Sequence, residues 1–183
     1  MNERNYAFFG VVGPVVAYLF IIVSIMLSPW FSWSTDALSD LGHAVRSDVA
    51  PLFNFGLLLA GFFIMIYSIT AFRDHAKYAS YCLLISAFLL QLVATFDEVY
   101  VFLHFLVSVL FFVSFGFASI TYALERKSIL AAVAFTIVLG SWILYFAGIY
   151  SAGVAVPETI SSVAVVSWVM LSAFRIYLGR SNS

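Results

Sequence analysis

The stretch FFGVVGPVVAYLFIIVSIML, residues 8–27, runs for twenty residues without a charged side chain. An α-helix rises about 1.5 Å per residue, so a helix of this length crosses the roughly 30 Å hydrocarbon core of a bilayer. The stretch is too long, and too weakly basic at its start, for a cleaved signal peptide. We therefore interpret it as a retained membrane-spanning helix, in which neighbouring helices satisfy the carbonyl group that Pro14 leaves free.

The rest of the chain has the same character. Of its 183 residues, 64% are apolar and 9% are charged, and the mean hydropathy is +1.08. A soluble domain carries about 25% charged residues. We expect an all-α integral membrane protein whose whole length, 1–183, forms one compact bundle of six transmembrane helices. The expected spans are residues 6–28, 51–72, 78–96, 99–124, 128–146 and 157–177.

Charged side chains are divided between the two ends of such a bundle. Seven of the eight Lys and Arg residues fall at one end, and Arg46 is the exception: Arg4, Arg73, Lys77, Arg126, Lys127, Arg175 and Arg180. Six of the nine Asp and Glu residues fall at the other end: Asp36, Asp40, Asp48, Asp97, Glu98 and Glu158. The positive-inside rule predicts a cell (plasma) membrane protein with both termini in the cytoplasm. We expect any binding or chemistry at the acidic, extracytoplasmic end.

Composition also excludes some classes of partner and site. A net charge of −1 without a basic cluster argues against nucleic acid. Cys82 is the single cysteine, so neither an intramolecular disulfide nor a cysteine-based metal site is available. Small residues within the spans allow close backbone approach, which is typical of helix packing in lipid, and leave open a homo-oligomer through the same faces. They are Gly10 with Gly13, Gly56 with Ala60, Ser114 with Ala118, and Gly140 with Ser141.

The longest connection joins the first two spans, and we call it the 29–49 connection. It begins with Trp30, Phe31 and Trp33, which favour the boundary between water and lipid. Asp36 and Asp40 follow, four residues apart, as on one face of a short helix. We expect this helix to lie along the membrane surface.

His104 is the strongest single candidate for a functional residue. An ionisable side chain at membrane depth costs at least about 2.5 kcal/mol, so its presence there needs a reason. On a helix, Asp97, Tyr100, His104 and Ser108 are three or four residues apart and lie along one stripe, whereas Glu98 points elsewhere. The stripe could orient the imidazole or hold a metal. Alternatively, His104 hydrogen-bonds across helices and stabilises the bundle.

Other polar residues fall near the same end. Glu158 follows Pro157, where a carboxylate suits the positive end of a helix but could also point into the bundle. Asn54 and Gln91 lie in the outer half of their spans, where either interhelical hydrogen bonds or a hydrated cavity would account for them. His43 lies close to Asp40 in the 29–49 connection and makes a cluster of ligands conceivable.

These side chains include the donors that zinc accepts, namely imidazole nitrogen and carboxylate oxygen. The donors are His43, His104, Asp40, Asp97, Glu98 and Glu158, and for Zn or another divalent metal we favour His104, Glu98 and Glu158. There is no His-Glu-x-x-His sequence, so the signal is an accumulation at one end and not a motif. The sequence also lacks a Gly-x-Ser-x-Gly elbow, which disfavours serine-type hydrolysis.

Three segments together resemble a prokaryotic family of six-span membrane proteins of unknown function. They are Ser39-Asp-Leu-Gly42 followed by Ala50-Pro-Leu-Phe-Asn54, then Phe96-Asp-Glu98 with His104, and finally Val156-Pro-Glu158 with Trp168. The resemblance implies six helices and outward-facing motifs but no activity. Asp97 departs from the family's more frequent Phe-Pro at this place. A more distant similarity to membrane hydrolases that use Ser, Asp and His around zinc lacks their paired histidines.

We therefore expect a polar pocket at the extracytoplasmic end that binds a lipid head group or a small amphiphile. His104, Glu98 and Glu158 are the candidate catalytic residues if the protein is a metal-assisted hydrolase. The expected pocket also includes Asn54, Asp40, His43, Asp97, Tyr100, Ser108 and Gln91. The alternatives are a non-enzymatic structural or assembly subunit and, third, a proton or ion transporter.

Overall fold

The structure, a computed structural model, describes residues 3–179. Within this part of the chain all regular structure is helical, and six helices are long and apolar enough to cross a membrane, which confirms the expected fold class. The elements in chain order are α1 (Glu3–Ala7), α2 (Phe9–Met26), η1 (Leu38–Gly42), α3 (Ala50–Tyr67), η2 (Ser68–Phe72), α4 (Arg73–His75), α5 (Lys77–Thr95), η3 (Glu98–Tyr100), α6 (Phe102–Arg126), α7 (Ile129–Phe146) and α8 (Ala155–Tyr177).

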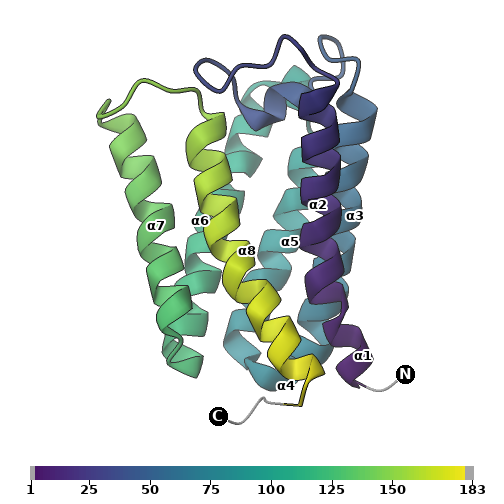
Figure 1. The fold of residues 1–183 in the computed structure, drawn as a ribbon, viewed down its shortest axis with the longest axis vertical. Coiled ribbons are helices and arrows are strands. Elements are labelled where there is room, and N and C mark those ends of the chain that lie inside the picture. Colours follow the sequence, from purple (N-terminus) through teal and green to yellow (C-terminus); the bar gives the residue numbers. More distant parts are fainter. Residues whose placement is uncertain (1–2, 180–183) are drawn as a thin grey trace.

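The long helices lie side by side along one axis, with α1 and the end of α8 at the same end of the bundle (Figure 1). Helices that follow one another in the chain pack together, and α2 also packs on α8. In contrast, the backbones of α6 and α8 come close to each other at few points, and the side chains of these two helices meet in the core at the basic end. This arrangement leaves room between α6, α7 and the start of α8.

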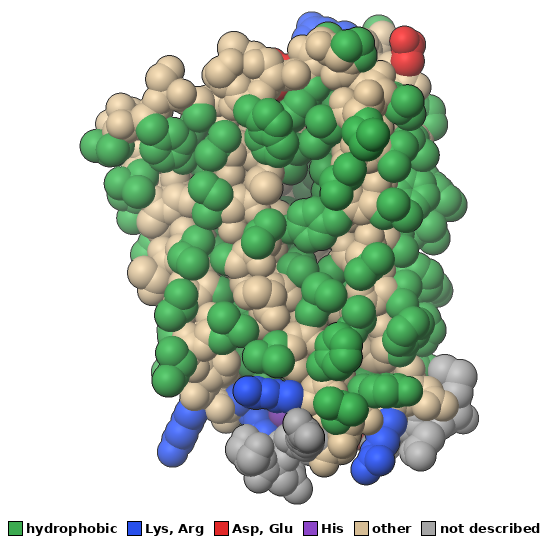
Figure 2. All heavy atoms as spheres, viewed as in Figure 1, with side chains coloured by type: hydrophobic (Ala, Val, Ile, Leu, Met, Phe, Trp, Pro, Cys, Tyr) green, Lys and Arg blue, Asp and Glu red, His purple; other side chains and the backbone are tan. Residues whose placement is uncertain are grey.

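Charged side chains follow the partition that the sequence predicts. Figure 2 shows Lys and Arg side chains at the lower end of one face, an apolar band above them, and acidic and basic side chains at the upper end. The upper end is the one at which the 29–49 connection and the α7–α8 connection meet (Figure 1). Arg180 lies outside the described residues.

Small residues allow the helices to approach closely, as expected. A Cβ at Gly10 would come within 2.8 Å of Ala173, and one at Gly13 within 2.8 Å of Ile64. These positions face neighbouring helices of the same chain. Gly140 differs, because nothing lies within 4 Å of a Cβ placed there. A homo-oligomer through small-residue faces stays a prediction.

Aromatic side chains fill the core at the basic end. The rings of Tyr122 and Trp168 stack with their centroids 4.6 Å apart, and Phe72 packs against both. The indole N–H of Trp168 donates to the Ser119 hydroxyl at 3.0 Å, so its polar atom is satisfied inside the bundle. The π-helical turn η2 places Phe72 in this cluster.

The acidic end departs from the prediction at two points. The short helix of the 29–49 connection is the 3₁₀ helix η1, which begins at Leu38, so Asp36 lies outside it and does not share a helix face with Asp40. The span expected from residue 99 begins at Phe102, because Glu98–Tyr100 form the separate 3₁₀ turn η3. Asp97 caps this turn, since its carboxylate accepts from the Val99 N–H at 2.9 Å. Val101 then has φ of 42°, which redirects the chain before α6 starts. The predicted stripe of four side chains is therefore wrong, and only its last two members lie on the same helix.

Candidate functional site

One short turn in the 29–49 connection holds three carboxyl groups from three parts of the chain. The three hydrogen bonds, each 2.7 Å long, run from the Ala37 N–H to Asp40, from the Leu38 N–H to Glu158, and from the Ser39 hydroxyl to Glu98. The N–H groups at the start of a short helix lack partners within it, so carboxylates satisfy them. The structure thus brings together three of the acids predicted for the site, and we call them the carboxyl cluster.

Glu158 is the most buried member of this cluster, with 8% of its surface exposed. It lies in the first turn of α8, directly after Pro157. One carboxyl oxygen accepts from Leu38, and the other has no hydrogen-bond partner among the described residues. Glu158 also lines both of the cavities described below. The second carboxyl oxygen of Glu158 is therefore available to accept a hydrogen bond from a bound molecule.

Glu98 lies in η3, between the membrane-spanning segments, and is half-buried. Burial raises its pKa from the ordinary value of 4.5 to about 7, and a hydrogen bond with Asp40 and the charge of Asp40 act in the same direction. The Ser39 hydroxyl and the Arg46 charge oppose this rise. Near neutral pH, Glu98 is therefore present in both its protonated and its ionised form.

His104 and Ser108 form a hydrogen-bonded pair one turn apart on α6. His104 Nδ1 lies 2.7 Å from the carbonyl oxygen of Phe96, the residue directly after α5. A carbonyl oxygen only accepts, so Nδ1 carries the hydrogen and donates it. In the neutral imidazole, Nε2 is then an acceptor, and it lies 3.3 Å from Ser108 Oγ. Both ring nitrogens thus have partners in the protein.

Three other predicted residues hold the acidic end together. Their side chains bond to backbone groups of neighbouring segments, as the structural alternative expects. Asp97 accepts from the Ala44 N–H at 3.2 Å, Asn54 donates to the Gly42 carbonyl at 2.8 Å, and Gln91 donates to the Leu58 carbonyl at 3.2 Å. None of the three is among the residues that line the large groove described below.

The remaining predicted residues lie apart from the cluster. His43 Nδ1 accepts from the Val45 N–H at 3.3 Å, a local bond within the 29–49 connection. Tyr100 is 55% exposed and packs edge-on against Phe96. Neither side chain lines the groove. His43 and His104 therefore do not face one another across this groove.

A groove of about 830 Å³ runs between α6 and α7, and we call it the α6–α7 groove. Its volume lies within the range of roughly 300 to 1,000 Å³ that is usual for small-molecule sites. Its polar lining gathers at the acidic end: Ser39, Glu98, His104, Ser108 and Glu158. The walls are aliphatic and aromatic, and include Phe105, Val109, Val113, Leu139 and Trp142. Ser39 was not predicted. The wall residues were not predicted either, because apolar residues that face lipid and apolar residues that line a groove look alike in sequence.

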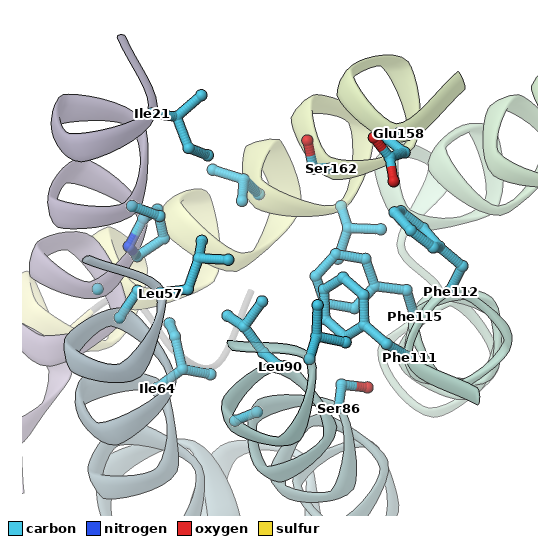
Figure 3. Close-up of a pocket in the computed structure, with 18 of the residues that line it drawn as sticks. Ile21, Leu57, Ile64, Ser86, Leu90, Phe111, Phe112, Phe115, Glu158 and Ser162 are labelled. Atoms are coloured by element: carbon cyan, nitrogen blue, oxygen red, sulfur yellow. The ribbon is translucent and has the colours of Figure 1, made fainter. Parts of the chain in front are cut away.

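A second cavity, of about 120 Å³, lies at the centre of the bundle. Figure 3 shows Glu158 and Ser162 of α8 at its edge, opposite apolar side chains such as Leu57 and Leu90. The residues that line both this cavity and the α6–α7 groove are Ser39, Ser108, Phe112 and Glu158. The polar groups therefore stand at the boundary between an outer groove and an inner cavity.

Metal binding stays a prediction. Within residues 3–179, no group of three or more His, Cys, Asp and Glu side chains is placed so that it could hold an ion. The carboxyl cluster and His104 line the same groove, but His104 donates from one nitrogen and faces Ser108 with the other. A divalent ion at His104 would have to displace Ser108 from Nε2.

Comparison with known proteins gives one match. The model of a family described as "Protein of unknown function (DUF998)" matches residues 11–175, nearly the whole bundle from α2 to α8. No curated protein and no solved structure matches the chain. The particular motifs of the family resemblance and a prokaryotic origin stay predictions.

Proposed function

The chain belongs to this DUF998 family of proteins of unknown function, and from its geometry we propose that it binds a lipid-like amphiphile in the α6–α7 groove. One observation carries the proposal: an apolar groove ends at the carboxyl cluster, whose members come from segments that are far apart in the sequence. An apolar tail and a polar head match the two parts of this site.

The groove is accessible from the lipid-facing side of the bundle. Phe105, Val109 and Phe117 line it on α6, and each is more than two-fifths exposed. Leu139 and Phe146 line the groove on α7 and are also exposed. In a bilayer these surfaces lie against acyl chains. A tail can therefore enter the groove sideways without first crossing water.

The polar end favours a head group that donates hydrogen bonds. Glu158 offers an oxygen without a partner among the described residues, and Glu98 offers a second carboxyl group. Phosphate is usually bound by Arg, Lys or backbone N–H groups. No Lys or Arg of residues 3–179 is among the side chains that line the groove. A hydroxyl or amine head group therefore fits this end better than a phosphate.

The charge partition supports an extracytoplasmic site. The basic residues gather at the opposite end, which the positive-inside rule assigns to the cytoplasm. The head group would then lie at the outer surface of the plasma membrane. The hydrogen bond that Asp97 accepts and those that Asn54 and Gln91 donate favour a structural role for these three residues, as the assembly-subunit alternative expects. That alternative leaves the groove unexplained.

Trp142 provides a direct test because it lines the groove. Purified protein is titrated with a monoacylglycerol that carries bromine on its acyl chain, since bromine quenches indole fluorescence on contact. We expect saturable quenching that Trp142→Phe removes and that the groove-filling variant Val109→Phe/Val113→Phe weakens at least tenfold. Val133→Phe, on a lipid-facing position of α7 outside the groove lining, is the matched control and should bind as the parent does. Quenching that does not saturate, or that the filled groove leaves unchanged, contradicts the proposal.

A further inference from the structure

We propose that Ser108 and His104 are a nucleophile and its general base, and that they cleave an ester bond in an acyl amphiphile bound in the α6–α7 groove. This inference rests on the proposed binding function, because the groove must deliver the ester to Ser108. It adds a reaction and a substrate class, a long-chain carboxylic ester. The metal-assisted route considered from the sequence is not needed for this reaction.

The first support is the hydrogen-bonding order around the imidazole. The Phe96 carbonyl fixes the hydrogen on Nδ1, so Nε2 is left as an acceptor toward Ser108. An activated nucleophile requires a base within hydrogen-bond reach and a third group that orients this base. The distance of 3.3 Å between Ser108 Oγ and His104 Nε2 is slightly long, as is common before a substrate is bound. Phe96 acts here as a positioning residue.

The second support is the location of the hydroxyl group. Ser108 lines both the groove and the central cavity, whereas Ser114 on the same helix is buried and donates to the Phe111 carbonyl at 2.7 Å. Serine in a membrane helix usually bonds back to its own helix in this second way. Ser108 is directed to an imidazole instead. It lies about 9 Å along α6 from Phe102, at 1.5 Å per residue, a depth at which an ester carbonyl can follow its head group into the site.

The reaction needs no reactant other than the ester and water. Ser108 Oγ attacks the ester carbonyl carbon while its proton passes to His104 Nε2. The bond between this carbon and the leaving alcohol breaks, and the imidazolium returns the proton to the alcohol oxygen. Water then attacks the acyl-serine, gives a proton to Nε2, and releases the fatty acid as the proton returns to Ser108. The products are one carboxylic acid and one alcohol.

The pair does not need the nucleophile elbow whose absence disfavours serine hydrolysis in the sequence. An elbow exposes a serine at a sharp turn above a sheet. Here Ser108 is half-buried and lines the α6–α7 groove from the side of α6. A spacing of four residues on one helix then places the base beside the nucleophile.

The test is covalent labelling with a hexadecyl fluorophosphonate, followed by intact-protein mass spectrometry and peptide mapping. We expect one adduct per chain, on Ser108, with none in Ser108→Ala and unchanged labelling in the control Ser114→Ala. His104→Gln should slow labelling at least 100-fold, the usual contribution of a general base. Each variant is first titrated with the brominated monoacylglycerol, so that loss of folding or of the groove is recognised by loss of Trp142 quenching.

The outcomes separate the two proposals. Saturable Trp142 quenching without a Ser108 adduct overturns the catalytic inference and leaves amphiphile binding intact. Absence of quenching in the parent protein overturns the binding proposal itself. An adduct that persists in Ser108→Ala, or that His104→Gln does not slow, also overturns the assignment.

Discussion

The Leu38 N–H and the Glu158 carboxylate are joined by a 2.7 Å hydrogen bond across 120 residues of sequence. The bond ties the 29–49 connection to the first turn of α8. Two backbone bonds beside it, from Gly153 to Trp33 and from Ala155 to Asp36, join the same two segments. The acidic end is therefore closed by contacts between a long connection and the start of the last helix, and Glu158 is a structural as well as a site residue.

Glu158→Ala should lower the free energy of unfolding by about 1–3 kcal/mol, because the buried Leu38 N–H loses its acceptor. Glu158→Gln keeps an oxygen at this place and should stay within about 0.5 kcal/mol of the parent. Asp48 is exposed, so Asp48→Ala is the matched control and should change little. Thermal unfolding in detergent measures all three. An alanine variant as stable as the glutamine variant would contradict this role of the bond.

Stability should fall as pH rises from about 4.5 to about 7. The folded protein holds the Glu98 proton up to a pKa of about 7, whereas the unfolded chain releases it near 4.5. Between these values the folded state binds more protons, so deprotonation favours unfolding. The stabilisation is complete below pH 4.5 and lost above pH 7. Asp40, Ser39, Arg46 and Glu158 face this group and modulate the effect.

The measurement is the midpoint of thermal unfolding of the parent and of Glu98→Gln between pH 4 and pH 8. Glutamine does not titrate, so the variant should lose the part of the slope that belongs to Glu98. Asp48→Ala again serves as the control and should retain the slope. Parallel profiles for the parent and Glu98→Gln would show that Glu98 does not titrate in this range.

Gly153 and Gly140 should respond in opposite ways to alanine. A Cβ at Gly153 would come within 2.6 Å of the Asp36 nitrogen and would overlap its carbonyl oxygen, so Gly153→Ala should cost about 1–3 kcal/mol. Gly140 lies inside α7 with no atom within 4 Å, and Gly140→Ala should stabilise the helix by about 0.5–1 kcal/mol. Unfolding in detergent measures both. A tolerated alanine at Gly153 would mean that the two connections are not packed together.

Val101→Gly should raise the free energy of unfolding by about 1 kcal/mol. Val101 has φ of 42°, a conformation in which a β-branched side chain is strained and glycine is not. The side chain is 75% exposed, so little packing is lost. Val99→Gly, two residues earlier in η3, is the control and should destabilise by up to about 1 kcal/mol. An equal loss of unfolding free energy in Val101→Gly and Val99→Gly would show that the backbone at Val101 is not strained.

The sequence predicted which residues gather at the acidic end but not how they are arranged there. Glu98, His104 and Glu158 were expected at the acidic end, and they line one groove there. The common stripe of Asp97, Tyr100, His104 and Ser108 failed, because Val101 restarts the helix at Phe102. Ser39 could not be singled out, since nothing in its neighbourhood indicates that residues 37–39 would collect three carboxyl groups.

By itself, the sequence determined that this chain forms six membrane-spanning helices, with seven of its eight cations at one end and six of its nine acids at the other. The reason is that lipid tolerates only long runs without charge, and such runs are visible residue by residue. Only the tertiary structure decided that a groove opens between α6 and α7 and that Ser108 and Glu158 line it. A helix in lipid is apolar on all its sides. The sequence pattern therefore does not tell which side packs against another helix, which side contacts lipid, and which side lines a cavity.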